Sequence, residues 1–442
     1  MDSLQPQRLE QPYPRLAYAW YVIGVLFLIT LLSQLDRQLP ALLVRPIRTA
    51  FGISDTQFSL LQGYAFSLCY TLMGLPLGRL VDRAVRRTLI FWGMLFWCAM
   101  TALSAFADSY GWLLLTRMGV GVGEAVLAPA AYSMIADYFA PARRGRALAV
   151  YYTSLAAGSG ASLLLGGWLL GVIPKTGLEV PGIGMLEAWR VCFLAAAVPG
   201  VVLAVLLFTV REPARREQPG QAAAPSVRQF LHYLSGHRAT FSRLLTYPAM
   251  LAIIGYGMLA WAPAVFERRF GMPTSRSGVI LGILIAVVGV LGTLLSGVLS
   301  DRWSARGVGS ARFRVAFTGT LVCAPFGTLW PLAPDANTAF VLLGCAIFGL
   351  SIAQSAAPAS IQEVVPNRMR GQAIAVYLLI AGLLGIGLGP MLVAFVSDTL
   401  FGDSAKLPQA ISCIVAPVSL LAIWLCWSGL RPYAATRATT AA

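Results

Sequence analysis

Charged side chains are scarce in this sequence, at 12% of 442 residues, and histidine occurs only twice. Hydrophobic residues make up 57% of the chain and the mean hydropathy is +0.72, which is too apolar for ordinary soluble domains. No HExxH or paired-cysteine metal pattern, no GxSxG and no P-loop occurs. These absences disfavour a membrane enzyme, and without a nucleotide-binding motif any transport must be driven by gradients.

The cysteines do not predict a disulfide framework or a metal site either. All seven cysteines fall inside apolar stretches without a CxxC or Cys/His cluster, so we expect buried thiols, no metal site and no cofactor. His232 and His237 lie in a polar stretch and are expected to be ordinary loop residues. The net charge of +15 suits either nucleic acid or a membrane surface, and its placement along the chain favours membrane lipids over nucleic acid.

Apolar stretches of about 20 residues recur, each long enough to cross roughly 30 Å of hydrocarbon as a helix. They predict twelve spans, at residues 18–40, 56–78, 88–107, 111–137, 146–172, 188–210, 246–266, 277–299, 313–332, 338–362, 371–397 and 409–429. An even number places both termini on one side. Most of the 33 Lys and Arg residues fall in the tails and in the loops after even-numbered spans, so the positive-inside rule predicts cytoplasmic termini in a bacterial-type inner membrane.

An internal repeat divides the chain into halves. GRLVDR from Gly78 recurs as GVLSDR from Gly297, and the same interval separates Phe51-Gly52 from Phe270-Gly271. Two parallel halves with a substrate path between them near the membrane midplane are expected for such a repeat. The predicted organisation is a cytoplasmic tail, a six-helix bundle, a linker rich in Pro, Gln, Ala and Arg, a second six-helix bundle and a second tail, at residues 1–17, 18–210, 211–245, 246–429 and 430–442.

The motifs resemble those of a known family. Gly78, Leu80, Asp82, Arg83 and Arg86-Arg87 look like the major facilitator loop signature, although Val85 stands where that signature usually has glycine. RMGVGVGEA from Arg117 is similar to the arginine-glycine motif of span 4. LDRQ from Leu35 and WAPAVFERRFG from Trp261 resemble the Spinster branch of lipid transporters. The resemblance implies an all-α major facilitator fold with two pseudo-symmetric six-helix bundles, alternating access and a monomer.

Four charged residues fall inside predicted spans: Asp36, Arg37, Arg117 and Glu124. A charge at the bilayer centre costs about 3 kcal/mol on insertion scales, so such residues face a cavity or a partner. Glu124 follows Arg117 by seven residues and therefore shares its helix face roughly 10 Å away. We expect Arg37 or Arg117 to bind an anionic head group, and Asp36 and Glu124 to exchange protons. The alternative is a static Asp36–Arg117 pair that joins span 1 to span 4.

The repeated loop motif predicts a conformational latch that holds the halves together on the cytoplasmic side. In this hypothesis Asp82 accepts from a neighbouring helix N-terminus and pairs with Arg86 or Arg83. The alternative is that the arginines only anchor the loop. The predicted latch residues are Gly78, Asp82, Arg83, Arg86, Asp301 and Arg302.

Polar and aromatic side chains within the spans are candidates for the cavity wall. Besides Arg37, Arg117 and Glu124, the predicted substrate-binding residues are Tyr64, Tyr152, Tyr256, Trp261, Gln354 and Tyr377. Fixed charges concentrate in the N-terminal half, which suits an amphipathic substrate whose head meets that half. The sequence therefore predicts a proton-coupled secondary transporter of an anionic lipid-like substrate. A small organic anion or drug is the alternative substrate, and a transport-inactive receptor on the same fold is a further alternative.

Overall fold

The computed structural model describes residues 13–182, 184–215 and 226–441, and its described part is almost entirely helical. The predicted tail at residues 1–17 and the linker at 211–245 lie partly outside these residues. The elements of the first half are α1 Leu16–Leu42, α2 Val44–Phe51, α3 Asp55–Ser59, η1 Leu60–Tyr64, α4 Ala65–Val81, α5 Arg86–Ser104, α6 Tyr110–Glu124, α7 Leu127–Tyr138, α8 Pro141–Val172, β1 Leu178–Val180, β2 Gly184–Leu186 and α9 Ala188–Leu207.

The second half begins after the linker. Its elements are α10 Val227–Gly236, α11 Arg238–Phe270, α12 Thr274–Leu284, η2 Ile285–Gly289, α13 Val290–Ala305, α14 Ala311–Leu329, η3 Trp330–Leu332, α15 Ala336–Glu363, η4 Asn367–Met369, α16 Arg370–Ala381, η5 Gly382–Leu388, α17 Gly389–Phe395, η6 Val396–Leu400, η7 Ser404–Lys406 and α18 Leu407–Ala441. Four of the short elements, η1, η2, η5 and η6, are π-helical turns inside longer helices.

Each predicted span falls on a helix or a continuous helical run. Among the described residues, eleven helices are long and apolar enough to cross a membrane by length and composition. The remaining predicted span, 56–78, follows α3, η1 and α4 without a gap. Span 4 is interrupted once, between α6 and α7.

Helix ends differ most from the sequence-based expectation at the polar segments. Helix α10 and the first turns of α11 occupy residues expected in the linker, and α18 continues through the expected C-terminal tail. Hydropathy locates the part of a helix that matches lipid, whereas helical hydrogen bonding continues into water wherever local residues permit it. At α10 a capping box between Ser226 and Gln229 provides the start.

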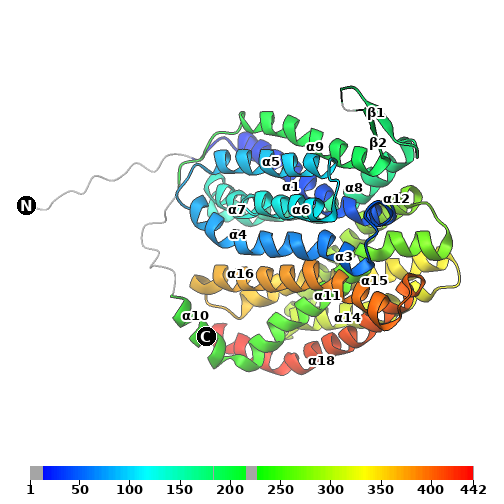
Figure 1. Cartoon of the computed structure of the whole chain (residues 1–442). Helices are drawn as coiled ribbons and strands as arrows, with labels where there is room; N and C mark the ends of the chain where they lie inside the picture. The colour runs from blue at the N-terminus through cyan, green and yellow to red at the C-terminus, as the bar shows by residue number, and fades with distance from the viewer. Residues whose placement is uncertain (1–12, 183, 216–225, 442) are drawn as a thin grey trace, which may run out of the picture.

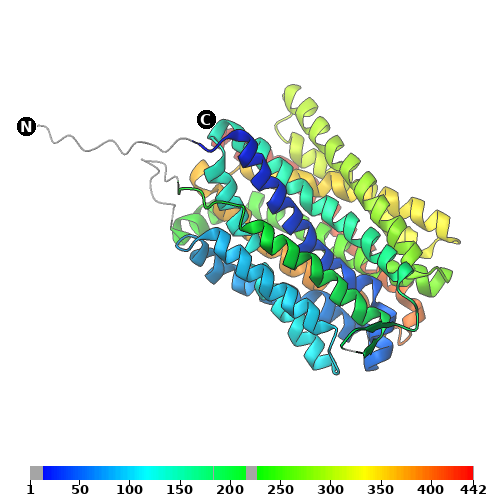
Figure 2. The same ribbon diagram turned by 90° about the horizontal axis from the view of Figure 1, so that it is seen from above.

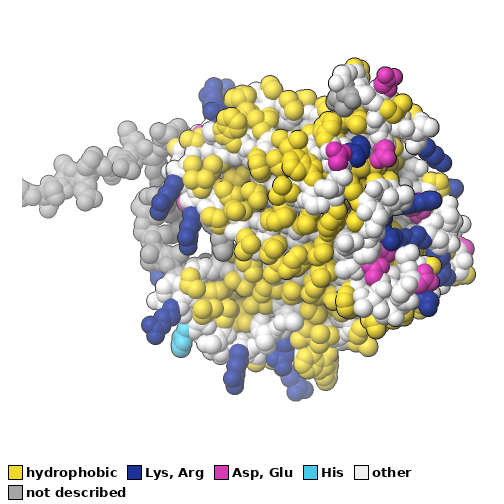
Figure 3. Space-filling model, in the orientation of Figure 1, with side chains coloured by type: hydrophobic (Ala, Val, Ile, Leu, Met, Phe, Trp, Pro, Cys, Tyr) yellow, Lys and Arg dark blue, Asp and Glu magenta, His cyan; other side chains and the backbone are white. Residues whose placement is uncertain are grey.

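The two termini of the bundle lie at one end, which we call the terminal end, where α1 begins and α18 finishes (Figures 1 and 2). The other end, which we call the opposite end, carries the β1–β2 hairpin and the α1–α2 and α11–α12 connections. In Figure 3 hydrophobic side chains cover the flank, and the basic and acidic side chains gather towards the two ends. Large apolar residues of the described helices, such as Trp92, Val202 and Leu420, are more than half exposed, which suits contact with lipid chains.

The repeat is visible in the backbone. Gly52 ends α2 and Gly271 ends α11, each with a φ of +62°. This left-handed conformation favours glycine because a side chain would clash with the backbone. The repeated Phe-Gly pair therefore closes a helix in each half.

The halves touch through α8 against α12 and through η1 and α4 against η5. Small residues permit these contacts, since a methyl group on Gly282 would lie 2.5 Å from the Gly160 carbonyl oxygen.

Candidate functional site

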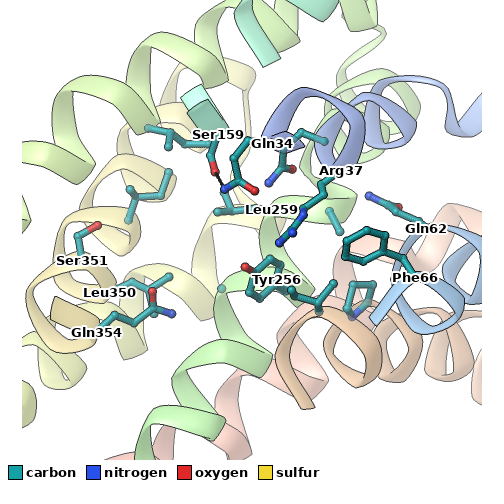
Figure 4. Close-up of a pocket in the computed structure, with 18 residues that line it drawn as sticks. Gln34, Arg37, Gln62, Phe66, Ser159, Tyr256, Leu259, Leu350, Ser351 and Gln354 are labelled. Carbon is teal, nitrogen blue, oxygen red and sulfur yellow. Dashed lines mark hydrogen bonds between the residues drawn. The ribbon is translucent and has the colours of Figure 1, made fainter. Parts of the chain in front are cut away.

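A central cavity of about 190 Å³ lies between the two halves. Helices from both halves contribute to its wall: α1, η1 and α4 on one side, and α11, α15 and η5 on the other. Figure 4 shows glutamine, serine and aromatic side chains turned towards this space, with Leu259 and Leu350 between them. Arg37 is the one charged residue among the described residues that line it.

Arg37 is held by contacts on one side and open on the other. Its Nε donates to Glu124 Oε2 at 2.7 Å, and its guanidinium carbon lies 4.8 Å from the ring centroids of both Phe66 and Tyr70. No described protein group accepts from its two terminal nitrogens, and the side chain is 20% exposed. Arg37 can therefore offer two donors to an anion in the cavity without leaving Glu124.

Glu124 is the buried partner of this arginine. Its side chain is 0% exposed, and Oε2 also accepts from Ser33 Oγ at 2.7 Å. Oε1 has no described partner. Span 4 is interrupted directly after Glu124, so this carboxylate lies at the end of α6 near the centre of the bundle.

Asp36 and Arg117 lie side by side but form no ion pair within 4 Å. Arg117 Nη2 donates to the backbone oxygen of Asp36 at 3.0 Å, while both Asp36 carboxylate oxygens lack a described partner. Both residues are at most 1% exposed. Arg117 of span 4 thus binds span 1 through the backbone carbonyl of Asp36, and the Asp36 carboxylate takes no part in this hydrogen bond.

A group of contacts that the sequence did not predict closes the opposite end. Arg268 of α11 donates to both carboxylate oxygens of Asp55 at 2.7 Å, and Arg48 pairs with the same carboxylate at 2.8 Å. Thr56 donates its backbone N–H to Asp398 Oδ2 at 2.6 Å and its hydroxyl at 2.8 Å. With the exposed pair of Arg45 and Glu267, these are the hydrogen bonds and ion pairs between described residues of the two halves. These bonds join the halves at the opposite end, and no such bond joins described residues of the two halves at the terminal end.

Comparison with known families agrees with this architecture, because the model of the Major Facilitator Superfamily matches residues 26–390. The chain belongs to the Major Facilitator Superfamily. It is 31% identical to an MFS-type efflux pump of Mycolicibacterium smegmatis over 94% of this chain and 93% of that protein. It is 28% identical to the sphingosine-1-phosphate transporter SPNS2 of Xenopus tropicalis over 89% of this chain and 77% of that protein.

A solved structure places the chain more closely within the superfamily. The crystal structure of a bacterial homologue of the human lysosomal transporter Spinster, in an inward-facing and unoccupied conformation, superposes with a TM-score of 0.82. That protein is 27% identical, and the match covers 97% of this chain and 98% of the other. The chain is a Spinster-like, multi-pass membrane transporter, and the predicted all-α fold with twelve spans in two six-helix bundles is confirmed.

The other predicted substrate-binding residues of this major facilitator protein differ in whether they line the cavity or lie behind its wall. Tyr256 and Gln354 line the cavity. Trp261 is fully buried beside it and donates to the Pro390 backbone oxygen at 3.0 Å. Tyr64 packs at the η1–η5 contact, where it would meet a side chain on Gly387. The remaining two, Tyr152 and Tyr377, lie on α8 and α16, and neither is among the described residues that line the cavity.

In this conformation the described residues do not make the contacts of the predicted latch, which therefore stays a prediction. Arg86 pairs with Asp137 and with Glu212, whose Oε1 lies 2.7 Å from its Nε, so it does not pair with Asp82. The reason is position: Arg86 begins α5 and is fully buried against its own half, whereas Asp82 is exposed. Asp301 is also exposed, like Arg83 and Arg302, and no described residue pairs with it. Gly78 has open space around its α-carbon.

No three His, Cys, Asp or Glu side chains gather as a metal-binding group in the described ranges.

Proposed function

We propose that this chain is a proton-coupled secondary transporter that moves an anionic, lipid-like amphipathic substrate by alternating access. The observation that carries the proposal is Arg37: it is the charged residue of the central cavity, its Nε is held by Glu124, and its terminal nitrogens have no described protein partner. The mainly apolar wall opposite suits the apolar part of the same substrate.

Proton binding and substrate binding are coupled in this proposal because Glu124 and the anionic substrate both bind Arg37. An ionised Glu124 competes with the substrate for the guanidinium, so a proton on Glu124 strengthens substrate binding at Arg37. Asp36 is the second proton carrier, because its two carboxylate oxygens are buried without a described donor and an ion in that position is costly.

The orientation is part of the proposal. The arginine-rich connections after α4, α7, α9, α13 and α15 lie at the terminal end, which favours a cytoplasmic location for that end and for both termini in a bacterial-type inner membrane. With the opposite end locked, the cavity then faces the cytoplasm. The cavity is built from both halves of one chain, which supports a monomer as the working unit.

The substrate class rests on the relatives and on the cavity. A relative named as a sphingosine-1-phosphate transporter supports an anionic lipid. The relative named as an efflux pump supports the second candidate, a small organic anion or drug, bound by the same arginine.

Transport in reconstituted vesicles tests the proposal. Purified protein is reconstituted, and flux of a lysophospholipid, a sphingoid lipid and a short carboxylate is measured with and without a pH gradient. We expect lipid flux that the gradient accelerates, and in Glu124→Gln we expect that acceleration to be lost while the protein stays folded. The control is Glu179→Gln, which makes the same change at an exposed position of the hairpin. Unaltered pH dependence in Glu124→Gln would contradict the coupling, and flux of the carboxylate alone would favour the second candidate.

A further inference from the structure

A second cavity, of about 700 Å³, lies at the opposite end of the bundle. Arg45, Arg48 and Thr49 of α2 line it from the N-terminal half, and Arg268 of α11 and Ser404 of η7 line it from the C-terminal half. None of its described lining residues also lines the central cavity. We call it the opposite-end cavity. Because both halves contribute to its wall, it has this shape only while the halves are joined at this end.

The opposite-end cavity carries an excess of positive charge. Three arginines line it, and Glu267 is the one carboxylate among its described lining residues. Glu267 pairs with Arg45, and the fully buried Asp55 pairs with both Arg48 and Arg268. Two carboxylates thus meet three guanidinium groups, which leaves one positive charge in excess. In Figure 3 basic side chains lie next to acidic ones at this end, whereas the arginine-rich connections lie at the terminal end.

Several hydrogen-bond donors of this cavity have no described acceptor. Arg45 is engaged only through Nη1, by Glu267, and Arg48 is engaged through Nη1 and Nε. The other nitrogens of these two arginines, and the hydroxyls of Thr49 and Ser404, donate to no described group. The two arginine side chains are 75% and 25% exposed, so their unengaged nitrogens are within reach of a ligand from solvent.

The number and kind of these donors suit a phosphate group. A guanidinium presents its N–H groups in a planar fork that matches phosphate oxygens, and a hydroxyl can rotate to donate to an anion. Four donor groups from two halves of the chain surround one space. A carboxylate offers two oxygens in one plane, whereas the tetrahedral phosphate offers oxygens in several directions. A volume of about 700 Å³ also leaves room for a group attached to the phosphate.

We propose that the opposite-end cavity is a phosphate-binding site, in which Arg45 and Arg48 bind the anion and Thr49 and Ser404 donate further hydrogen bonds. The ligand is a phosphate group, either as the free ion or on a lipid head group. The inference goes beyond the proposed function and does not depend on it, because the central cavity and its Arg37 take no part in this site.

Isothermal titration calorimetry tests the site with inorganic phosphate, added to the delipidated full chain in a neutral detergent. Acetate at the same ionic strength is the comparison probe, and wild type should bind phosphate at least about tenfold more tightly than acetate. Arg45→Gln should weaken phosphate binding about tenfold, because it removes a charge-assisted hydrogen bond. The matched control is Arg276→Gln, an exposed arginine of α12 outside the cavity, which should keep the wild-type affinity. Arg37→Gln should keep it as well.

Native mass spectrometry then distinguishes the two sources of the phosphate group. Wild type, Arg45→Gln and Arg276→Gln are purified from vesicles of phosphatidylcholine and phosphatidylglycerol, and the retained lipids are counted. If a lipid head group is the ligand, Arg45→Gln should retain one phosphatidylglycerol fewer than the other two proteins. If the free ion is the ligand, lipid retention should be equal while Arg45→Gln alone binds phosphate more weakly.

Three results would overturn the inference. One is that Arg45→Gln matches Arg276→Gln in both phosphate affinity and retained phosphatidylglycerol. Another is that acetate binds as tightly as phosphate. The third is that phosphate binding is lost in Arg37→Gln and kept in Arg45→Gln, which would place the anion in the central cavity. Failure of lipid transport in vesicles would contradict the proposed function and leave this site unaffected.

Discussion

The lock at the opposite end allows a prediction about the conformational equilibrium. Asp55 is fully buried and accepts two bonds from Arg268 across the halves and one from Arg48 within its own half. When the halves separate at this end, the Arg268 bonds must break while the Arg48 pair can persist. Arg48 thus keeps Asp55 paired in both states and lowers the cost of opening. Asp55→Asn should favour the state that is open at the opposite end.

The size of the effect follows from the bonds that are lost. Asparagine has one acceptor oxygen and no charge, so the change removes about one charge-assisted hydrogen bond that only the closed state makes. Such a bond contributes about 1.5–3 kcal/mol. The equilibrium should therefore shift roughly 10- to 150-fold towards opening of the opposite end, at about 1.4 kcal/mol per factor of ten.

Spin-label distance measurements provide the assay, in protein whose native cysteines are replaced by alanine. One label pair, at Asp108→Cys and Ala405→Cys, reports the opposite end, and a second, at Thr88→Cys and Ala305→Cys, reports the terminal end. With Asp55→Asn the first distance should lengthen and the second shorten in a larger fraction of molecules.

Glu267→Gln is the matched control, because it removes an ion pair across the same halves at the same end. That pair is solvated, with the Arg45 side chain 75% exposed, and exposed pairs contribute about 0.2–1 kcal/mol. We expect Glu267→Gln to shift the conformational equilibrium by a few-fold at most. Equal distance distributions in wild type and Asp55→Asn would refute the reasoning, as would an effect of Glu267→Gln as large as that of Asp55→Asn.

Two further predictions concern packing. Arg86→Met should lower the free energy of unfolding by about 3–5 kcal/mol, measured by thermal unfolding in detergent, because it removes a buried cation that pairs with both Asp137 and Glu212; an unchanged melting temperature would argue against this. Gly63→Ala should disfavour the observed contact with η5 by about 1–3 kcal/mol and slow transport in vesicles. Gly74→Ala, on the same span with open space around it, should leave the transport rate unchanged. Equal transport rates in both variants would contradict the prediction.

Much of the fold follows from sequence alone because the information is local. A span needs only a sufficient run of apolar residues, and its helix satisfies its own backbone, so the predicted stretches coincide with helices. The repeat marks the two halves for the same reason, since Gly52 and Gly271 end helices through their own backbone conformation. The scarcity of charge also singled out Asp36, Arg37, Arg117 and Glu124 before any contact was known.

Only the tertiary structure decided which of these groups meet. Sequence placed Asp36 near Arg117 but not the Arg37–Glu124 pair, because the partner of a side chain depends on how two helices are rotated against one another. It likewise predicted a role for Asp82 and missed Asp55, whose partner on α11 belongs to the other half. Composition and helical period determine that a charge is buried, and packing between helices determines what it binds.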